Sequence, residues 1–273
     1  QKGYIDEPYY EFYEDHDDNG NPTWRCECHI KGDDEYYWIN SSSKKNGKKR
    51  PLSIPTIKDR AMQTLYLFAL QPVEETIADE HSYGFRINRG CKDACEQAFA
   101  ALSLKRSAQW VLEGDIKGCF DNISHEWMLE NIPMDKRVLA QFIQAGYIFK
   151  RQLFPTSRGA IQGGAISPTL ANMVLDGLEP LLKAHFKPKW VNGKMYYPAI
   201  NYTRYADDFI IGVNGSKADC EWIKAELKQF ISEKLKMELS EEKTLITHSS
   251  QYARFLGYDI RVRRSNQLKP SGK

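Results

Sequence analysis

The sequence has no uninterrupted apolar run near the ~18 residues that a membrane-spanning helix needs. Cysteine is scarce as well: the six cysteines are irregularly spaced and form no C-x₂-C pair of the kind that zinc ribbons use. We therefore expect reduced thiols rather than a disulfide framework or a structural zinc site. No secretory signal peptide and no internal repeat is visible. These absences exclude helical membrane proteins and repeat proteins, and they predict a protein that is not secreted.

The formal net charge of only +2 conceals a strong local asymmetry. Residues 1–37 hold 11 acidic and 3 basic residues, for a net charge of −8, whereas residues 44–60 hold 7 basic residues and 1 acidic residue, for a net charge of +6. The basic stretch contains Asn46-Gly47, the strongest short signal for a β-hairpin. A hairpin that carries lysines at its tip is typical of a loop that contacts phosphates.

Two adjacent aspartates, Asp207 and Asp208, stand between short segments that are rich in β-branched and aromatic residues. We predict a β-hairpin of residues 202–206 and 209–213 with the acids at its tip, because Asp is depleted inside strands and common in turns. Carboxylates about 4 Å apart repel by roughly 1 kcal/mol in water and about 4 kcal/mol at an effective dielectric constant of 20. A divalent cation removes this repulsion, and ligation by oxygen alone suits Mg²⁺.

A catalytic Mg²⁺ site needs a third acid, which we expect at the end of a buried strand. Residues 110–115 have the apolar character of such a strand, and Asp115 ends it. Glu113 and Asp121 are rivals of the same chemical type. Side chains alternate along a strand, so Glu113 and Asp115 share a face, and spacing alone does not decide between them.

The remaining elements are predicted from apolar periodicity and from capping residues. Thr56 opens a helix with a T-x-x-D cap, and Gln71-Pro72 is expected to end it before a second helix near residues 73–78. The apolar stripe of the first helix is Ile57, Ala61, Leu65, Phe68 and Ala69. Further helices are expected at residues 92–104, 124–129, 135–149 and 218–235, one long helix from 167 through 182, and strands near 24–30, 36–40, 243–247 and 252–262.

Seven short motifs occur along the chain. They are Arg50-Pro-Leu-Ser-Ile-Pro-Thr-Ile-Lys-Asp-Arg60, Ser82-Tyr-Gly-Phe-Arg86, Asp115-Ile-Lys-Gly-Cys-Phe-Asp121, Gln162-Gly-Gly-Ala-Ile-Ser-Pro168, Tyr205-Ala-Asp-Asp208, Leu239-Ser-Glu-Glu-Lys-Thr244 and Phe255-Leu-Gly-Tyr258. In this order they resemble the reverse transcriptase domain of group II intron-encoded proteins (maturases). The resemblance covers roughly residues 44–262, and seven motifs in order are far more specific than any one alone.

The resemblance implies an α+β fold, the right-hand polymerase with fingers and palm, in which the palm is an antiparallel sheet covered by helices. Residues 1–43 are expected to form an acidic N-terminal segment grouped with the fingers. Residues 44–106 are expected to be fingers, and residues 107–262 palm, with fingers-type helices around 124–160. Residues 263–273 are expected to be a linker toward a thumb that is absent from the sequence.

The resemblance also selects Asp115 as the first catalytic acid, since the family's D-x-x-x-F-D stretch begins there. It implies that Lys243 protonates the leaving pyrophosphate and that Phe120 packs where a ribose 2′-hydroxyl would lie. The implied residue sets are Asp115, Asp207, Asp208 and Lys243 for catalysis; Asp115, Ile116, Asp207 and Asp208 for two Mg²⁺ ions; Lys44, Arg50, Phe120 and Gln162 for the nucleotide; Lys45, Lys48, Lys49, Arg86 and Arg89 for RNA; and Phe255, Leu256 and Gly257 for the primer grip.

The implied function is RNA-directed DNA polymerisation: two-metal transfer of a nucleotide from a dNTP to a primer 3′-hydroxyl on an RNA template. The expected partners are intron RNA or another RNA template, a DNA primer and dNTPs, with no membrane and with a homodimer left open. The expected location is the bacterial cytoplasm or an organelle. Two alternatives stay open: an RNA-binding splicing scaffold with little polymerase activity, and a reverse transcriptase of the retron, CRISPR-linked or diversity-generating lineages.

Overall fold

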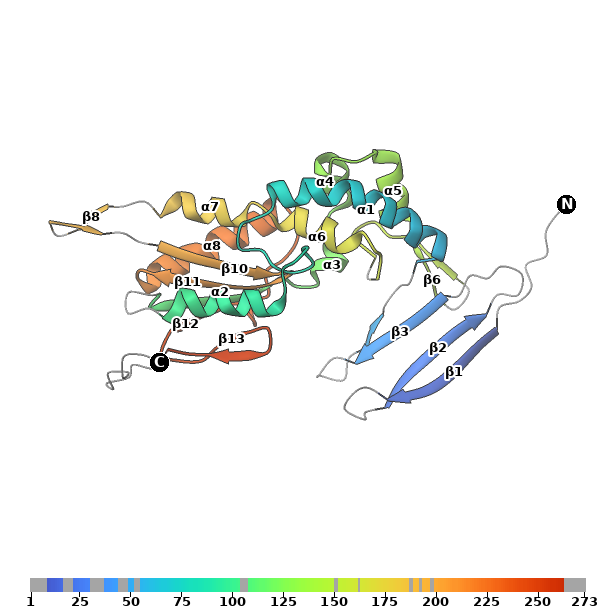
Figure 1. Cartoon of the computed structure of the whole chain (residues 1–273), viewed down its shortest axis with the longest axis horizontal. Helices are drawn as coiled ribbons and strands as arrows, with labels where there is room; N and C mark the ends of the chain where they lie inside the picture. Colours follow the sequence, from blue (N-terminus) through green and yellow to red (C-terminus); the bar gives the residue numbers. More distant parts are fainter. Residues whose placement is uncertain are drawn as a thin grey trace. The chain divides into compact units, whose positions relative to one another are not determined.

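The computed structural model of the protein describes residues 9–16, 22–29, 37–43, 49–51, 55–103, 108–149, 152–161, 163–186, 189–191, 193–196 and 199–262 (Figure 1). The chain divides into two compact units: the first comprises Gln1–Glu74 and Phe120–Ala171, and the second Glu75–Cys119 and Asn172–Lys273. Residues 75–103, which the sequence grouped with the fingers, thus belong with the central sheet. The functional division into fingers and palm stays a prediction.

The second unit is built on a four-stranded antiparallel sheet in the order β10-β11-β5-β12. The strands are β10 (Ala199–Tyr205), β11 (Asp208–Asn214), β5 (Trp110–Asp115) and β12 (Leu245–His248). Helix α2 (Cys91–Ser103) lies along β10 and β11, α7 (Leu178–His185) contacts β10, and α8 (Lys217–Glu233) contacts β5 and β12 (Figure 1). The α+β class and the antiparallel sheet covered by helices are therefore confirmed.

The two faces of the sheet have different roles. One face carries Val111, Glu113 and Asp115 in β5, and α2 covers the part that lies away from Asp115. The core on this side consists of Ala94, Ala98, Leu102, Ala108, Val111, Ile210, Ala253 and Phe255. The opposite face carries Leu112, Phe209 and Ile211, none of which has any exposed surface. Gly114 makes room there for the ring of Phe209, because a Cβ at this glycine would lie 2.3 Å from Phe209 Cζ.

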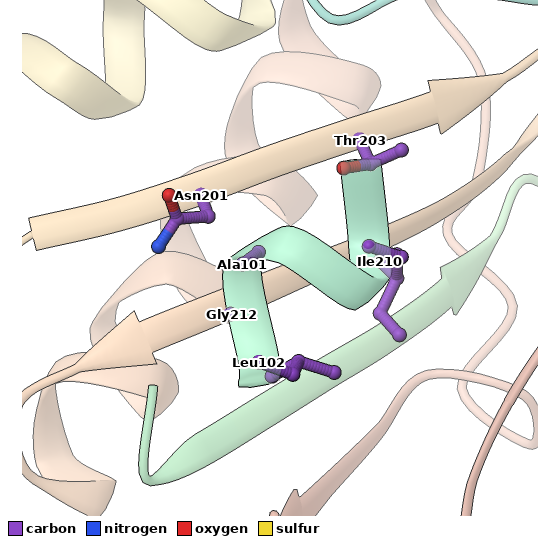
Figure 2. Close-up of a pocket in the computed structure, with 7 residues that line it drawn as sticks. Ala101, Leu102, Asn201, Thr203, Ile210 and Gly212 are labelled. Atoms are coloured by element: carbon purple, nitrogen blue, oxygen red, sulfur yellow. The ribbon is translucent and has the colours of Figure 1, made fainter. Parts of the chain in front are cut away.

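A small apolar hollow remains between α2 and the strands that it crosses (Figure 2). Its walls come from Ala98, Ala101 and Leu102 of α2 and from Asn201, Thr203, Ile210 and Gly212 of β10 and β11. Gly212 lets the chain pack closely at this point, since a Cβ there would lie 3.0 Å from the Cβ of Ala108. The hollow is a packing feature of the core.

Two predictions of helix length are wrong, in each case because a glycine ends the helix. The long helix expected from 167 through 182 is two helices, α6 (Ser167–Leu175) and α7, separated by Gly177 at φ +95°. The helix expected at 135–149 is α5 (Lys136–Gln144), which ends before Gly146 at φ +74°. The chain then continues as a hairpin of β6 (Tyr147–Phe149) and β7 (Gln152–Phe154). A left-handed conformation favours glycine and terminates helices.

The first unit contains a second antiparallel sheet and several helices. The sheet runs in the order β1-β2-β3-β4, and the pairing of Ser43 with Lys49 confirms the predicted hairpin around residues 44–48, which themselves lie outside the described residues. Ser124 caps α4 as predicted. The elements are β1 (Tyr9–His16), β2 (Pro22–His29), β3 (Tyr37–Ser43), β4 (Lys49–Pro51), α3 (Cys119–Asn122) and α4 (His125–Asn131).

Helix α1 (Ile57–Ile77) begins as predicted and then departs from two expectations. Thr56 and Asp59 form the predicted cap, with Asp59 N donating to Thr56 Oγ1 over 3.1 Å. Pro72 lies inside the helix and does not break it, because the face that buries Gln63, Leu70 and Glu74 continues across the proline. The predicted apolar stripe is exposed instead. No helix in the described part of the chain has both the length and the apolar character to cross a membrane.

Two small hairpins complete the second unit. The segment 252–262, predicted as one strand, is the hairpin β13 (Ala253–Phe255) and β14 (Tyr258–Ile260), with Leu256 at φ +50° and Gly257 at φ +84° in the turn. The other hairpin is β8 (Lys189–Val191) with β9 (Lys194–Tyr196).

Candidate active site

The acids Asp115 and Asp208 lie directly opposite each other on the neighbouring antiparallel strands β5 and β11. Directly opposed residues share a face of the sheet, with their Cβ atoms about 4.5–5.5 Å apart. Asp207 precedes Asp208 in the two-residue turn between β10 and β11, and Ala206 before it has φ +56°. The predicted hairpin is therefore confirmed, but its turn is Ala206–Asp207, and Asp208 is the first residue of β11, beside the acid that ends the buried strand.

The electrostatics of this group favour a cation. Burial raises the pKa of Asp208 to about 6, and the charges of Asp115 and Asp207 act in the same direction. The backbone N–H of Leu256, which donates to Asp208 Oδ2 over 3.2 Å, and the charge of Lys243 oppose this shift. Negative charge is thus in excess of the positive charge around it. A donor set made only of oxygens fits hard divalent cations such as Mg²⁺.

The stretch Leu239–Thr244 brings Lys243 to the acids. Leu239 pairs with Ile116, and Ser240 N donates to the carbonyl oxygen of Asp115 over 2.9 Å. A tight turn follows, and Lys243 Nζ then lies 2.8 Å from Asp115 Oδ2. The Ile116 side chain is buried in the core, so only its backbone carbonyl oxygen is chemically able to serve as a metal ligand.

Glu113, which sequence spacing left as an alternative to Asp115, makes a structural contact instead. Its carboxylate accepts a hydrogen bond from the backbone N–H of Arg254 in β13. Burial raises the pKa of Glu113, and this hydrogen bond opposes the shift. Asp208 makes the equivalent contact with the N–H of Leu256. The β13–β14 hairpin, which holds the predicted primer-grip residues Phe255, Leu256 and Gly257, is therefore anchored to the acid-bearing face by two carboxylates.

Of the two arginines predicted to bind RNA, Arg86 is buried and Arg89 is half-buried. The Arg86 side chain is 2% exposed and forms an ion pair with Glu75, with Arg86 Nη2 2.7 Å from Glu75 Oε2. Arg86 Nη1 also donates to the carbonyl oxygens of Asp79 and Ser82. Arg89 donates to the carbonyl oxygen of Glu80 over 2.6 Å. Both guanidinium groups fasten the loop 79–86. Burial of Arg86 speaks against its predicted RNA contact, whereas the RNA contact of Arg89 stays a prediction.

The remaining predicted site residues fall in the first unit. Phe120 is half-buried in α3. Lys44, Lys45, Lys48 and Gln162 lie outside the described residues, and the structure describes only the backbone of Lys49 and Arg50 in β4. Sequence reasoning missed Gln63, a buried polar residue of α1 whose Oε1 accepts from Ala165 N over 2.8 Å. Gln63 thereby holds the loop that follows Gln162.

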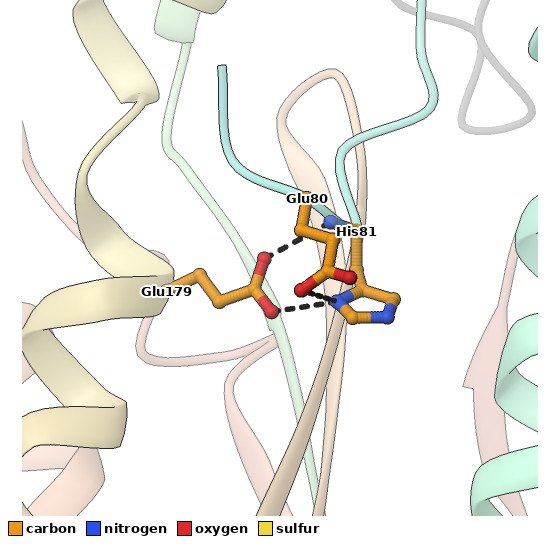
Figure 3. A group of neighbouring side chains, drawn as sticks. All are labelled: Glu80, His81 and Glu179. Atoms are coloured by element: carbon orange, nitrogen blue, oxygen red, sulfur yellow. Dashed lines mark hydrogen bonds and ion pairs between the residues drawn. The ribbon is translucent and has the colours of Figure 1, made fainter. Parts of the chain in front are cut away.

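A second group, Glu80, His81 and Glu179, brings three ligand-type atoms within 4.8 Å of one another (Figure 3). Among the described residues, the three aspartates do not form a group this close. Lys183 Nζ lies 2.6 Å from Glu179 Oε1 and 3.5 Å from Glu80 Oε2. Because an ammonium already lies between its two carboxylates, we interpret this group as a salt-bridge network.

Glu179 is expected to make stability depend on acid pH. Burial raises its pKa, but hydrogen bonds from His81 and Lys183 outweigh burial and lower it to about 2. Because the pKa in the folded state lies below the unfolded value near 4.5, the ionised carboxylate stabilises the fold above about pH 4.5. This contribution is lost as the pH falls from there toward 2. We expect Glu179→Gln to cost on the order of 3 kcal/mol at neutral pH, with the cost shrinking below about pH 4.5. Urea unfolding across this range measures it, and the exposed neighbour Glu80, changed to Gln, is the control. A pH-independent cost would contradict this assignment.

The family model described as "Reverse transcriptase (RNA-dependent DNA polymerase)" matches residues 42–260. The chain is 40% identical to the Group II intron-encoded protein LtrA of Lactococcus lactis subsp. cremoris, over 85% of this chain and 48% of that protein. It is 33% identical to Protein YkfC of Escherichia coli (strain K12), over 81% of this chain and 66% of that protein.

The chain thus spans about half the length of the first of these relatives. Among solved structures, telomerase from Candida tropicalis in complex with a fragment of telomeric RNA superimposes with a TM-score of 0.55. That match covers 80% of this chain and 42% of the telomerase chain at 14% identity, so it bears on the fold alone.

Proposed function

Since this chain belongs to the reverse transcriptase (RNA-dependent DNA polymerase) family, we propose that it extends a DNA primer on an RNA template. We infer that it does so as the polymerase part of a group II intron-type protein, which the 40% identity to such a protein supports. The observation that carries the proposal is the acid group: Asp208 lies opposite Asp115, next to Asp207, with its pKa raised to about 6.

In the proposed mechanism, two Mg²⁺ ions would be held by Asp115, Asp207, Asp208 and the carbonyl oxygen of Ile116. When bound, such a pair stabilises the charge on the attacking and leaving oxygens of an in-line phosphoryl transfer. The chain itself contributes preorganisation: strand pairing sets Asp115 against Asp208, and the N–H of Leu256 orients the Asp208 carboxylate. Prealigned groups do not have to be ordered during the reaction, which lowers its barrier.

We propose that Lys243 donates a proton to the leaving pyrophosphate. Its side chain is 65% exposed, and its ammonium group contacts Asp115 Oδ2 at 2.8 Å. An exposed, flexible side chain can turn from this carboxylate toward a bound triphosphate, and an ammonium both donates a proton and offsets negative charge.

The other substrate contacts are proposals from the family resemblance. Lys44, Arg50 and Gln162 would bind the dNTP, with Phe120 against its sugar. The turn of the β13–β14 hairpin would hold the primer end, which its anchoring by Glu113 and Asp208 supports. RNA contacts are proposed for Lys45, Lys48, Lys49 and the half-buried Arg89.

Primer extension tests the proposal directly. We expect the 273-residue chain to extend a DNA primer on an RNA template with dNTPs and Mg²⁺, and Asp207→Asn to lower the rate by about 10³-fold or more, since the change removes a charged metal ligand. Asp135→Asn is the matched control, because Asp135 caps α5, where Asn caps equally well.

Equal rates for wild type and Asp207→Asn would contradict the two-metal assignment. Binding of the RNA without any extension of the primer would instead favour the RNA-binding scaffold. The salt dependence of that binding would then report how many phosphates the chain contacts.

A further inference from the structure

A buried arginine lies three residues before the acidic turn. Arg204, in β10, has no exposed surface, and its Nη2 lies 2.5 Å from Asp176 Oδ1, whose side chain is 5% exposed. It pairs with Phe209 across the hairpin, on the face opposite the acids. Taking a charge out of water is costly even when it is paired, and replacing a buried ion pair with apolar side chains is often neutral or stabilising. Stability alone therefore does not account for a guanidinium here.

The same guanidinium holds the backbone of the acidic turn. Arg204 Nη1 donates to the carbonyl oxygen of Ala206 over 3.3 Å and to Asn172 Oδ1 over 3.1 Å. The Ala206 carbonyl belongs to the peptide that joins Ala206 to Asp207. Ala206 is also in the left-handed region at φ +56°, where a residue with a Cβ is strained and persists only if its surroundings impose that conformation.

A second segment packs on the preceding peptide, which joins Tyr205 to Ala206. A Cβ on Gly84 would lie 2.4 Å from Ala206 N, so the loop that contains Gly84 packs directly on the turn backbone. Asn172 Nδ2 donates to the carbonyl oxygen of Gly84 over 2.8 Å, while Asn172 Oδ1 accepts from Arg204. One amide side chain of α6 thus ties the loop to the arginine. Backbone hydrogen bonds from Tyr83 N to Arg204 O and from Arg204 N to His81 O complete the attachment.

We propose that Arg204 is a positioning residue for the acid group. With Asn172 and Gly84, it fixes the backbone from Tyr205 to Asp207 so that the carboxylates of Asp207 and Asp208 are held ready for divalent cations. The inference rests on the proposed function and deepens it. It also gives the stretch Ser82–Arg86 a role within this molecule: its backbone packs on the acidic turn and hydrogen-bonds to Arg204.

The test compares three single variants. Arg204→Lys keeps the charge for Asp176 but lacks the planar fork that reaches Ala206 and Asn172 together. Gly84→Ala pushes on the Ala206 backbone without any change of charge. Leu227→Ala is the control: this buried residue lies in α8, which contacts β5 and β12, so its loss lowers stability without touching the turn.

Two measurements are made below the melting temperature of every variant. Binding of Mn²⁺ to the protein alone is followed by electron paramagnetic resonance, and primer extension yields kcat, the KM for primer–template and the half-saturating Mg²⁺ concentration. We expect Arg204→Lys and Gly84→Ala to weaken Mn²⁺ binding, to raise the half-saturating Mg²⁺ concentration and to lower kcat by about 10- to 100-fold, with KM unchanged. Leu227→Ala should leave all four quantities close to wild type.

The inference is overturned if Arg204→Lys and Gly84→Ala weaken Mn²⁺ binding no more than Leu227→Ala does. Because Mn²⁺ binding needs no polymerisation, this outcome is distinct from a failure of the proposed function. If wild type extended no primer while Arg204→Lys still weakened Mn²⁺ binding, the positioning role would stand and the polymerase proposal would fail.

Discussion

Replacing Asp208 with Asn is expected to raise the stability of the metal-free protein while it abolishes polymerisation. Burial and the charges of Asp115 and Asp207 raise the pKa of Asp208 to about 6, so the folded state carries the ionised carboxylate at a cost near neutral pH. Asn removes the charge and keeps an oxygen that accepts from Leu256 N. We expect a gain of about 1–3 kcal/mol at pH 7, which corresponds to a rise of several degrees in melting temperature.

The size of this effect depends on pH, while its sign stays the same. A raised pKa means that the protonated form stabilises the fold fully below the unfolded value of 3.8, and that this stabilisation is lost as the pH rises through about 6. The advantage of Asp208→Asn over wild type should therefore be small near pH 4 and complete above pH 7. Thermal unfolding at several pH values measures it, with Asp135→Asn as the control.

The effect of added Mg²⁺ on stability distinguishes a metal site from a group of carboxylates that only repel one another. A ligand that binds only the folded state raises its stability by mass action, so Mg²⁺ should raise the melting temperature of wild type and leave Asp208→Asn unchanged. Primer extension by the variant should fall by about 10³-fold or more. A variant that is both less stable than wild type and active would show that Asp208 is a structural residue.

What the sequence predicted well was local in the chain. The hairpin around Asp207 and Asp208 follows from strand-forming segments on either side of two acids, and the strand ending at Asp115 follows from its apolar run. The choice of Asp115 over Glu113 came from the family resemblance. The structure adds a physical reason: the Glu113 carboxylate is engaged by the backbone of Arg254, while Asp115 lies opposite Asp208.

What the sequence did not predict depends on contacts between distant residues. Asp79 accepts hydrogen bonds from Gly177 N and Glu179 N, so a residue about 100 positions away caps α7 and helps to separate it from α6. The apolar periodicity of α1 identifies a helix, yet Leu65 and Phe68 on its apolar stripe are 61% and 69% exposed. A charge pattern likewise cannot tell that Arg86 pairs with Glu75 rather than with RNA.

Replacing Phe120 with Val is expected to relax the choice of sugar. Phe120 follows Asp115 by five residues, and its carbonyl oxygen accepts from Ala160 N over 2.7 Å, which fixes the backbone that carries the ring. The side chain is half-buried, unlike the core residues Cys119 and Ile123 near it in sequence. A rigid ring that packs against the sugar of a dNTP would exclude a 2′-hydroxyl by steric overlap, and Val would leave room for it.

We expect Phe120→Val to raise the incorporation of ribonucleotides relative to deoxyribonucleotides by at least about 10-fold, since contacts of this size discriminate substrates by one to two orders of magnitude. Primer extension with matched rNTP and dNTP measures the ratio. Phe142→Val is the control, because Phe142 packs edge-to-face on Tyr66 in the same unit, at 5.8 Å between ring centroids, and loses the same atoms. If Phe120 served only to pack the core, its change would cost about 1–3 kcal/mol and leave the sugar ratio at the wild-type value, as Phe142→Val should.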